Sequence, residues 1–152
     1  MSINPPTHRL PRAGVDRIDS HRAAMSVVSM ATHQPLRHET IVLLLDHHHR
    51  GAAVAVVTGT EADDDVLDTV ERLLTAADLD EVGAVVVASV RPGQVGSSVG
   101  EADIDRWLEL SDIVDEAGAE LLEWYVITDT VTCPRDLLGE PPRWWSADAR
   151  WG

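Results

Sequence analysis

The stretch "VVVASVRPGQVGSSVGEADIDRW", residues 85–107, decides the fold. It begins with an apolar run of strand length, continues through Ser89-Val90-Arg91-Pro92 into a Gly/Ser-rich loop, and ends in an acidic helix start. A continuous apolar run of this kind is typical of a strand that is buried on both faces. A strand, a loop and a helix N-terminus in this order also form a common framework for a binding or catalytic site.

Two periodicities extend this pattern outward along the chain. Short apolar runs predict strands over residues 40–46, 52–58, 82–88 and 119–128, and apolar residues at helical spacing predict helices over 61–77 and 101–117. The segment HHHRG between the first two apolar runs predicts a hairpin. The order β-β-α-β-α-β predicts a single α/β domain with a mixed sheet and two main helices.

Composition excludes several classes of protein. The 152-residue chain is 44% hydrophobic and carries a formal net charge of −14, which would repel phosphate backbones, so we expect no nucleic-acid binding by the folded body. Its single cysteine, Cys133, excludes an internal disulfide and a cysteine-rich zinc site. No apolar run approaches the roughly 20 residues that span a bilayer, so we expect a cytoplasmic protein with no membrane contact and no cofactor.

The two ends of the chain differ from the middle. Residues 1–38 carry five arginines against two acids, and residues 39–152 carry seven arginines against 24 acids. We therefore expect residues 1–36 to be a flexible basic arm, with one short helical region near residues 16–30. Residues 134–152 are rich in proline and tryptophan, and Trp144, Trp145 and Trp151 either cover an open part of the domain or bind a partner.

Four segments resemble the RadC family, a bacterial branch of the JAB/MPN (JAMM) metalloprotease fold. They are RHETIVLLLDHHHRG (37–51), the Thr-Gly-Thr at 58–60, VGAVVVASVRP (82–92) and GAELLEWYVI (118–127). The resemblance covers about residues 37–130 and implies a JAB/MPN-like, cytidine-deaminase-like domain over residues 37–133. In that family a zinc ion is held by two histidines and an aspartate, a glutamate is the general base, and a serine helps to stabilise the oxyanion.

This chain departs from that site at most positions. Ser89 and Arg91 occupy the two histidine positions, and arginine stays protonated and would repel a cation. Pro92 is retained, Asp103 matches the aspartate after a loop one residue longer, and Gly100 stands where the serine would be. Glu39 is one residue away from the glutamate position, which His38 occupies, and a shift of one residue turns a strand side chain to the other face.

Two interpretations of Arg91 remain open on the sequence. Arg91 forms an ion pair with Asp103 where the family holds its metal, or it binds a small anion together with Ser97 and Ser98. The first interpretation predicts that replacing Arg91 with alanine destabilises the fold.

The resemblance therefore implies a catalytically inactive protein that acts as a protein-interaction or scaffold module, with a protein partner or a second copy of itself. The alternative is a zinc-dependent JAMM-type hydrolase whose metal site is rearranged, with ligands from His38, Glu39, Asp103 or the tract His47–His49.

Overall fold

The computed structural model describes residues 12–77, 80–93 and 100–144. Its elements in chain order are α1 (His21–Ala31), β1 (Glu39–Leu45), β2 (Gly51–Thr58), α2 (Asp65–Ala76), β3 (Ala84–Val90), α3 (Glu101–Glu116), β4 (Glu120–Ile127), β5 (Val131–Thr132) and α4 (Pro134–Leu137). The six predicted elements are all present, each within four residues of its predicted ends. α1 overlaps the short helical region predicted near residues 16–30, and β5 and α4 are additional.

The strands form one five-stranded mixed sheet in the order β2-β1-β3-β4-β5. β1 is antiparallel to both β2 and β3, so the predicted hairpin is confirmed, and β3 runs parallel to β4. The parallel pair is joined through α3, which is the crossover connection that a parallel pair requires. The chain is therefore a single α/β domain with a mixed open sheet.

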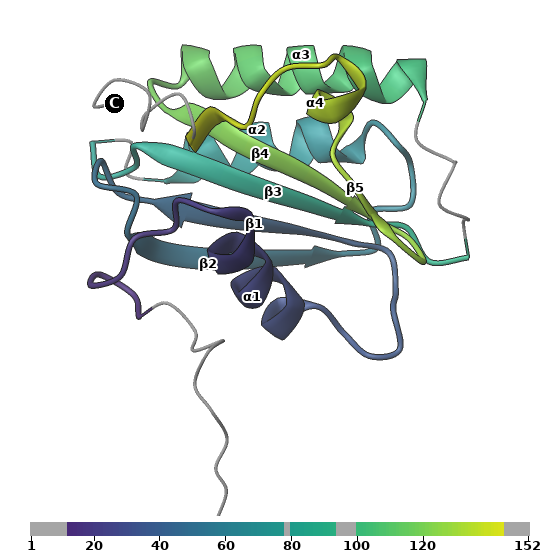
Figure 1. Ribbon diagram of the computed structural model, residues 1–152, viewed down its shortest axis with the longest axis horizontal. Helices are drawn as coiled ribbons and strands as arrows, with labels where there is room; N and C mark the ends of the chain where they lie inside the picture. The colour runs from purple at the N-terminus through teal and green to yellow at the C-terminus, as the bar shows by residue number, and fades with distance from the viewer. Residues whose placement is uncertain (1–11, 78–79, 94–99, 145–152) are drawn as a thin grey trace, which may run out of the picture.

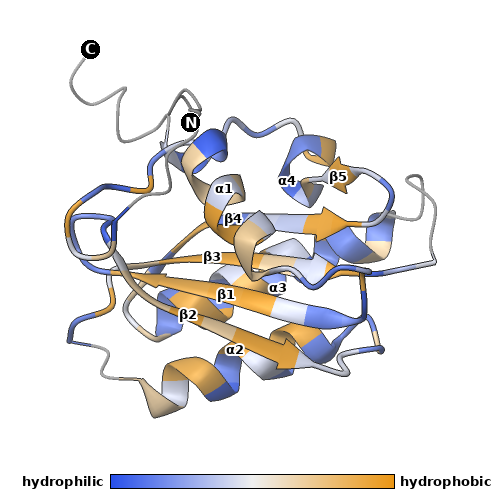
Figure 2. Cartoon of the chain, turned by 90° about the horizontal axis from the view of Figure 1, so that it is seen from below, coloured by the Kyte–Doolittle hydropathy of each residue, from blue (hydrophilic) through white to orange (hydrophobic). Residues whose placement is uncertain are grey.

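Helices cover both faces of the sheet (Figure 1). α2 and α3 pack side by side on one face, where Val87, Trp107 and Trp124 lie in one buried cluster. α1 packs on the other face, where Val28, Leu43 and Val86 belong to a second cluster. Every residue of β3 is buried, which confirms the prediction made from its continuous apolar run. Figure 2 shows the apolar character of β1 and β3 in the middle of the sheet.

The prediction of a flexible arm over residues 1–36 is wrong for residues 12–36. α1 begins after Ser20, whose hydroxyl accepts a hydrogen bond from the backbone N–H of Ala23, and it buries Ala24, Val27 and Val28 against the sheet. Ala24, Val27, Val28 and Ala31 recur at helical spacing on one face of α1, and Ser29 lies on its exposed side. Residues 1–11 lie outside the described residues.

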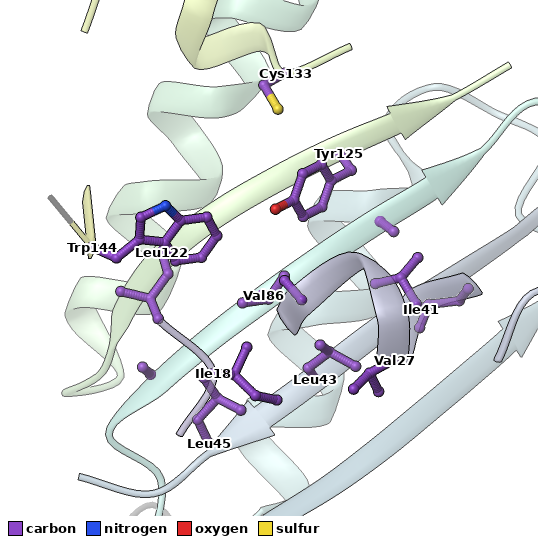
Figure 3. Packing of buried hydrophobic residues seen from close by; sticks show 14 of the residues in the cluster. Ile18, Val27, Ile41, Leu43, Leu45, Val86, Leu122, Tyr125, Cys133 and Trp144 are labelled. Carbon is purple, nitrogen blue, oxygen red and sulfur yellow. The ribbon is translucent and has the colours of Figure 1, made fainter. Parts of the chain in front are cut away.

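Trp144 is part of the core, so the prediction that it binds a partner is wrong. Its side chain is 2% exposed and packs with Leu122 and His21 on the α1 face of the sheet (Figure 3). The alternative interpretation, that this tryptophan covers the domain itself, is confirmed for Trp144. Trp145 and Trp151 lie outside the described residues. No helix in the described parts of the chain combines the length and the apolarity that crossing a bilayer requires.

Candidate functional site

The end of β3 lies between α2 and α3. Ser89 pairs across the sheet with Thr40 of β1, and its Oγ accepts a hydrogen bond of 2.9 Å from the indole Nε1 of Trp124. Because Trp124 belongs to the cluster beneath α2 and α3, Ser89 faces these helices. Its hydroxyl is thus already bound in the core.

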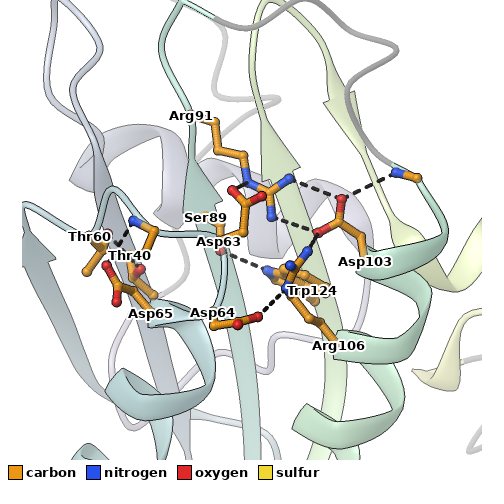
Figure 4. Close-up of polar contacts among 12 residues, drawn as sticks. Thr40, Thr60, Asp63, Asp64, Asp65, Ser89, Arg91, Asp103, Arg106 and Trp124 are labelled. Atoms are coloured by element: carbon orange, nitrogen blue, oxygen red, sulfur yellow. Dashed lines mark hydrogen bonds and ion pairs between the residues drawn. The ribbon is translucent and has the colours of Figure 1, made fainter.

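Arg91 follows two residues later on the same face and forms the predicted ion pair with Asp103 (Figure 4). Its Nη2 donates to Oδ1 at 2.8 Å and its Nη1 donates to Oδ2 at 3.1 Å. Both side chains are buried. This two-pronged geometry is the strongest arrangement that a guanidinium and a carboxylate form. Asp103 comes from the first turn of α3, so the pair fastens that helix to the end of β3.

Further charges extend this pair into an alternating chain. Arg106 donates from Nη1 to Asp103 at 2.9 Å and from Nε to Asp64 at 2.7 Å, while Nε of Arg91 lies 3.9 Å from Asp63. Desolvation by burial raises the pKa of Asp103, but the hydrogen bonds and charge of Arg91, with those of Arg106, outweigh it and leave the pKa below its ordinary value. Arg106 was not predicted as part of the site, although its position three residues after Asp103 on a helix places the two side chains side by side.

The chain of charges leaves little room for a ligand. The cavity beside Arg91, which Thr40, Thr60 and Ser89 also line, has a volume of about 10 Å³. That volume corresponds to about one water molecule. Both terminal nitrogens of Arg91 donate to Asp103, and this carboxylate already balances the charge that an anion would need. Ser97 and Ser98, the other members of the predicted anion site, lie outside the described residues.

Glu39 lies on the opposite face of the sheet from Arg91. Side chains of a strand alternate between the two faces of the sheet, so Glu39 shares a face with Ile41 and Leu43, which belong to the cluster beneath α1. Its carboxylate is buried, accepts a hydrogen bond from the backbone N–H of His33 at 3.0 Å, and lies 2.6 Å from Nδ1 of that histidine. The one-residue shift seen in the sequence therefore has the expected result, and Glu39 cannot act on a group bound at Arg91 or Asp103.

The histidines that the sequence analysis proposed as replacement ligands do not converge. Nε2 of His47 is bonded to the backbone carbonyl of Asp80, and His49 adopts a positive φ of 63° in the turn. Nδ1 of His38 is buried with no hydrogen-bond partner among the described residues. Within the described ranges, neither His38 nor any histidine of the tract His47–His49 belongs to a group of three metal-ligating side chains.

A second buried polar cluster, which was not predicted from the sequence, lies on the α1 face of β4. A bulge in β4 makes Leu122 an extra residue between the pairs Val85–Leu121 and Val86–Glu123, and it turns Glu123 toward α1 and α4. The Glu123 carboxylate is fully buried and accepts a hydrogen bond of 2.9 Å from Nε of Arg135, which is 1% exposed. The signal in the sequence was the single charged residue within the apolar run LLEWYVI.

His21 and Cys133 complete this second cluster. The ligand atoms of His21, Glu123 and Cys133 all lie within 4.8 Å of one another, which makes it the one three-ligand group among the described residues. Nδ1 of His21 is 2.8 Å from the Tyr125 hydroxyl. Burial raises the pKa of the Cys133 thiol to about 12, and zinc binds the thiolate rather than the thiol. Because Arg135 already holds the Glu123 oxygen nearest to His21, a metal ion would have to displace a buried guanidinium. The cluster therefore fits a structural ion pair better than a metal.

Comparison with known protein families finds no family model that matches this chain, and comparison with curated proteins finds no similar sequence.

Proposed function

We propose that this chain is a catalytically inactive JAB/MPN-like protein of RadC type and that it acts as a protein-interaction module. The observation that carries the proposal is the bidentate pair between Arg91 and Asp103, with distances of 2.8 and 3.1 Å. By the resemblance, these two positions would hold a metal ligand each. Here one of them supplies a fixed positive charge, and the other has both carboxylate oxygens engaged by it.

Three further observations support the loss of catalysis. Ser89, at the other histidine position, gives its hydroxyl oxygen to Trp124. Glu39, the acid next to the general-base position in the sequence, lies on the opposite face of the sheet from Ser89, Arg91 and Asp103. The adjoining cavity holds about one water molecule, which is too small for a scissile bond and its flanking groups. A zinc ion does not fit this set of residues.

The order of strands also agrees with the resemblance in outline. The antiparallel hairpin β1–β2, the following α2, and the parallel pair β3–β4 joined by α3 stand in the order that the four similar segments require. This agreement supports the JAB/MPN-like assignment, and the module function follows from an α/β body of that type whose site has lost its chemistry.

Zinc-dependent stability tests the catalytic half of the proposal. One site occupied at a hundredfold excess over its dissociation constant would stabilise the fold by about 2.7 kcal/mol. For a chain of this length that corresponds to a rise in melting temperature of roughly 5–10 °C. We expect the untagged protein to melt at the same temperature in zinc and in EDTA. A rise of that size in the wild type that persists in Cys133→Ser would overturn the proposal, and one lost in Cys133→Ser would place the metal at the second cluster.

Chemical cross-linking in the cells that make the protein tests the interaction half. We expect the chain in covalent complexes with protein, either another chain or a second copy. A control protein whose partner is known should be cross-linked to that partner in the same cells. If the control is cross-linked and this protein is recovered only as a single chain, the interaction function is wrong.

A further inference from the structure

β2 is an edge strand that lacks the usual protection of such strands. It lies at the end of the sheet and pairs only with β1 among the described residues. Its sequence, GAAVAVVT, contains no charged residue and no proline. Natural edge strands usually carry charges, proline or a covering element, because their unpaired N–H and C=O groups otherwise bind another strand.

Among the described residues, only the beginning of this edge is covered by another part of the chain. The backbone N–H of Gly14 donates to the carbonyl of Gly51 at 2.9 Å, and Arg17 forms an isolated bridge with Arg50. Residues 52–58 have no second strand beside them in the described parts of the chain. The uncovered part of the edge is centred on Ala55.

Apolar side chains gather beside the uncovered part. Val54 and Val56 are 47% and 38% exposed, and they lie on the α1 face because they pair with Leu43 and Ile41 of that cluster. Met30 of α1 is 63% exposed. Between them runs a groove of about 340 Å³, lined by Ile18, Val27, Met30, Leu43 and Val54. An apolar groove next to an unprotected edge is typical of a surface that another chain covers.

We propose that the occupant is a second copy of this chain, whose β2 pairs antiparallel with this β2 across a two-fold axis at Ala55. This pairing would join the two sheets into one continuous sheet and place α1 of both copies on the same face. Val54 of each copy would then lie opposite Val56 of the other, because the register is symmetrical about Ala55. The inference rests on the proposed interaction function and names the partner and the surface.

The charges at the two ends of β2 favour this antiparallel arrangement. Arg17 and Arg50 lie at its beginning, and the acidic residues Glu61 and Asp63 follow its end. With the axis at Ala55, Arg50 of one copy lies opposite Thr60 of the other, next to Glu61. The two-fold axis creates this contact twice, whereas a parallel pairing would bring the two arginine ends together.

The net charge of −14 on each copy opposes association, but salt screens this electrostatic repulsion over a short distance. At 0.15 M ionic strength the screening length is about 8 Å, so charges beyond the contact have little effect. The electrostatic energy of the dimer therefore depends mainly on residues at the β2 edge. Residues 51–60 carry no charge, and the residues that flank them carry opposite charges at the two ends of the strand.

Light scattering on the full chain at about 10–100 µM in 0.15 M salt tests the proposal. We expect a mass of twice 16.6 kDa. The double change Val54→Glu and Val56→Glu should reduce it to the mass of one chain, because it places four carboxylates around the axis. Val131→Glu is the matched control: Val131 is 49% exposed on β5 at the other edge of the sheet, so this variant should remain dimeric.

A charge exchange gives a second readout that does not depend on the apolar surface. Arg50→Glu should weaken the dimer by at least about tenfold in its dissociation constant, and adding Glu61→Arg should restore it. Circular dichroism of each variant confirms that the monomer is folded. A wild type that is monomeric throughout, or a dimer that neither set of variants weakens, overturns the β2 pairing. Neither result decides the interaction function, which the cross-linking experiment tests independently.

Discussion

Arg91 at the end of β3 and Asp103 in the first turn of α3 hold each other through two parallel hydrogen bonds in the interior of the protein. Desolvating two charges is costly, and such a pair is stable only when its geometry is good and the remaining polar atoms are bound. Arg106 and the backbone N–H of Gly100 meet that condition by donating to the same carboxylate. The pair fixes the relative positions of β3 and α3 and occupies the space that a ligand would need.

Replacing Arg91 with alanine should lower the free energy of unfolding by about 3–5 kcal/mol, because it leaves the Asp103 carboxylate buried with only part of its partners. Arg106 still donates to Asp103, so we expect the lower end of that range. Urea denaturation measures the loss. Arg72→Ala is the control: its ion pair with Asp68 is exposed, and its removal should cost less than about 0.5 kcal/mol.

The double variant Arg91→Met with Asp103→Leu distinguishes the effect of leaving a buried charge unpaired from the effect of lost packing. Removing both charges together should cost much less than Arg91→Ala alone, because no unpaired charge remains. Equal losses in the single and the double variant would contradict the ion-pair explanation and would indicate a packing effect.

The lowered pKa of Asp103 makes stability depend on pH in a defined direction. A carboxyl with a lower pKa in the folded state than its ordinary 3.8 contributes stability above that pH, and this contribution is lost as the pH falls through the folded value. Asp103→Asn should therefore be less stable than the wild type at pH 7, and the difference should narrow below about pH 4. Melting temperatures from pH 7 to pH 2 measure it, with the exposed Asp68→Asn as a variant whose difference stays near zero. A gap between wild type and Asp103→Asn that is constant with pH would contradict the lowered pKa.

The local patterns of the sequence predicted the sheet and its two main helices well. The apolar run before Ser89 is a fully buried strand, and the acidic helix start holds Asp103 where Arg91 reaches it. Face assignment also worked where strands alternate regularly, as the opposite orientations of Glu39 and Arg91 show. These features depend on neighbouring residues in the chain or on a strict period of two.

The parts that were missed depend on contacts between distant segments. In the sequence, Glu123 precedes β5 and Arg135 follows it. The bulge at Leu122 also reverses the alternation of side chains along β4, so no periodic pattern predicts that Glu123 lies beside Arg135. A short helical region was predicted near residues 16–30, but its packing on the sheet was not, because the contact of Val27 and Val28 with β1 joins distant segments. Trp144 could not be assigned because composition does not distinguish a tryptophan that fills a core from one that binds a partner.

Trp144→Ala should destabilise the protein by about 3–5 kcal/mol, because a fully buried tryptophan leaves a cavity that its neighbours only partly fill. The melting temperature and the intrinsic fluorescence measure the change. Leu137→Ala is the control from the same segment: Leu137 is 49% exposed, and its removal should change stability by less than about 0.5 kcal/mol. A variant at Trp144 that melts like the wild type would show that this tryptophan is not part of the stable core.

Cys133 should be almost unreactive in the folded protein. Its thiol is buried beside Glu123, and burial, followed by the charges of Glu123 and Asp136, raises its pKa from 9.0 to about 12. That change reduces the thiolate fraction at pH 8 by about a thousandfold, and the thiolate is the reactive form. Labelling with a coloured disulfide reagent should therefore proceed only as fast as the protein opens, and denaturant should make it immediate.

The same reagent distinguishes the two descriptions of the second cluster. If His21, Glu123 and Cys133 held zinc, the metal would keep the thiol as a thiolate, and adding a chelator would change the labelling rate. We expect the rate to be the same with zinc and with EDTA, because Arg135 and not a metal balances the Glu123 charge. In Arg135→Met the Glu123 carboxylate loses that partner, so this variant should be destabilised and should label faster than the wild type. A chelator-sensitive rate in the wild type would instead make the cluster a metal site.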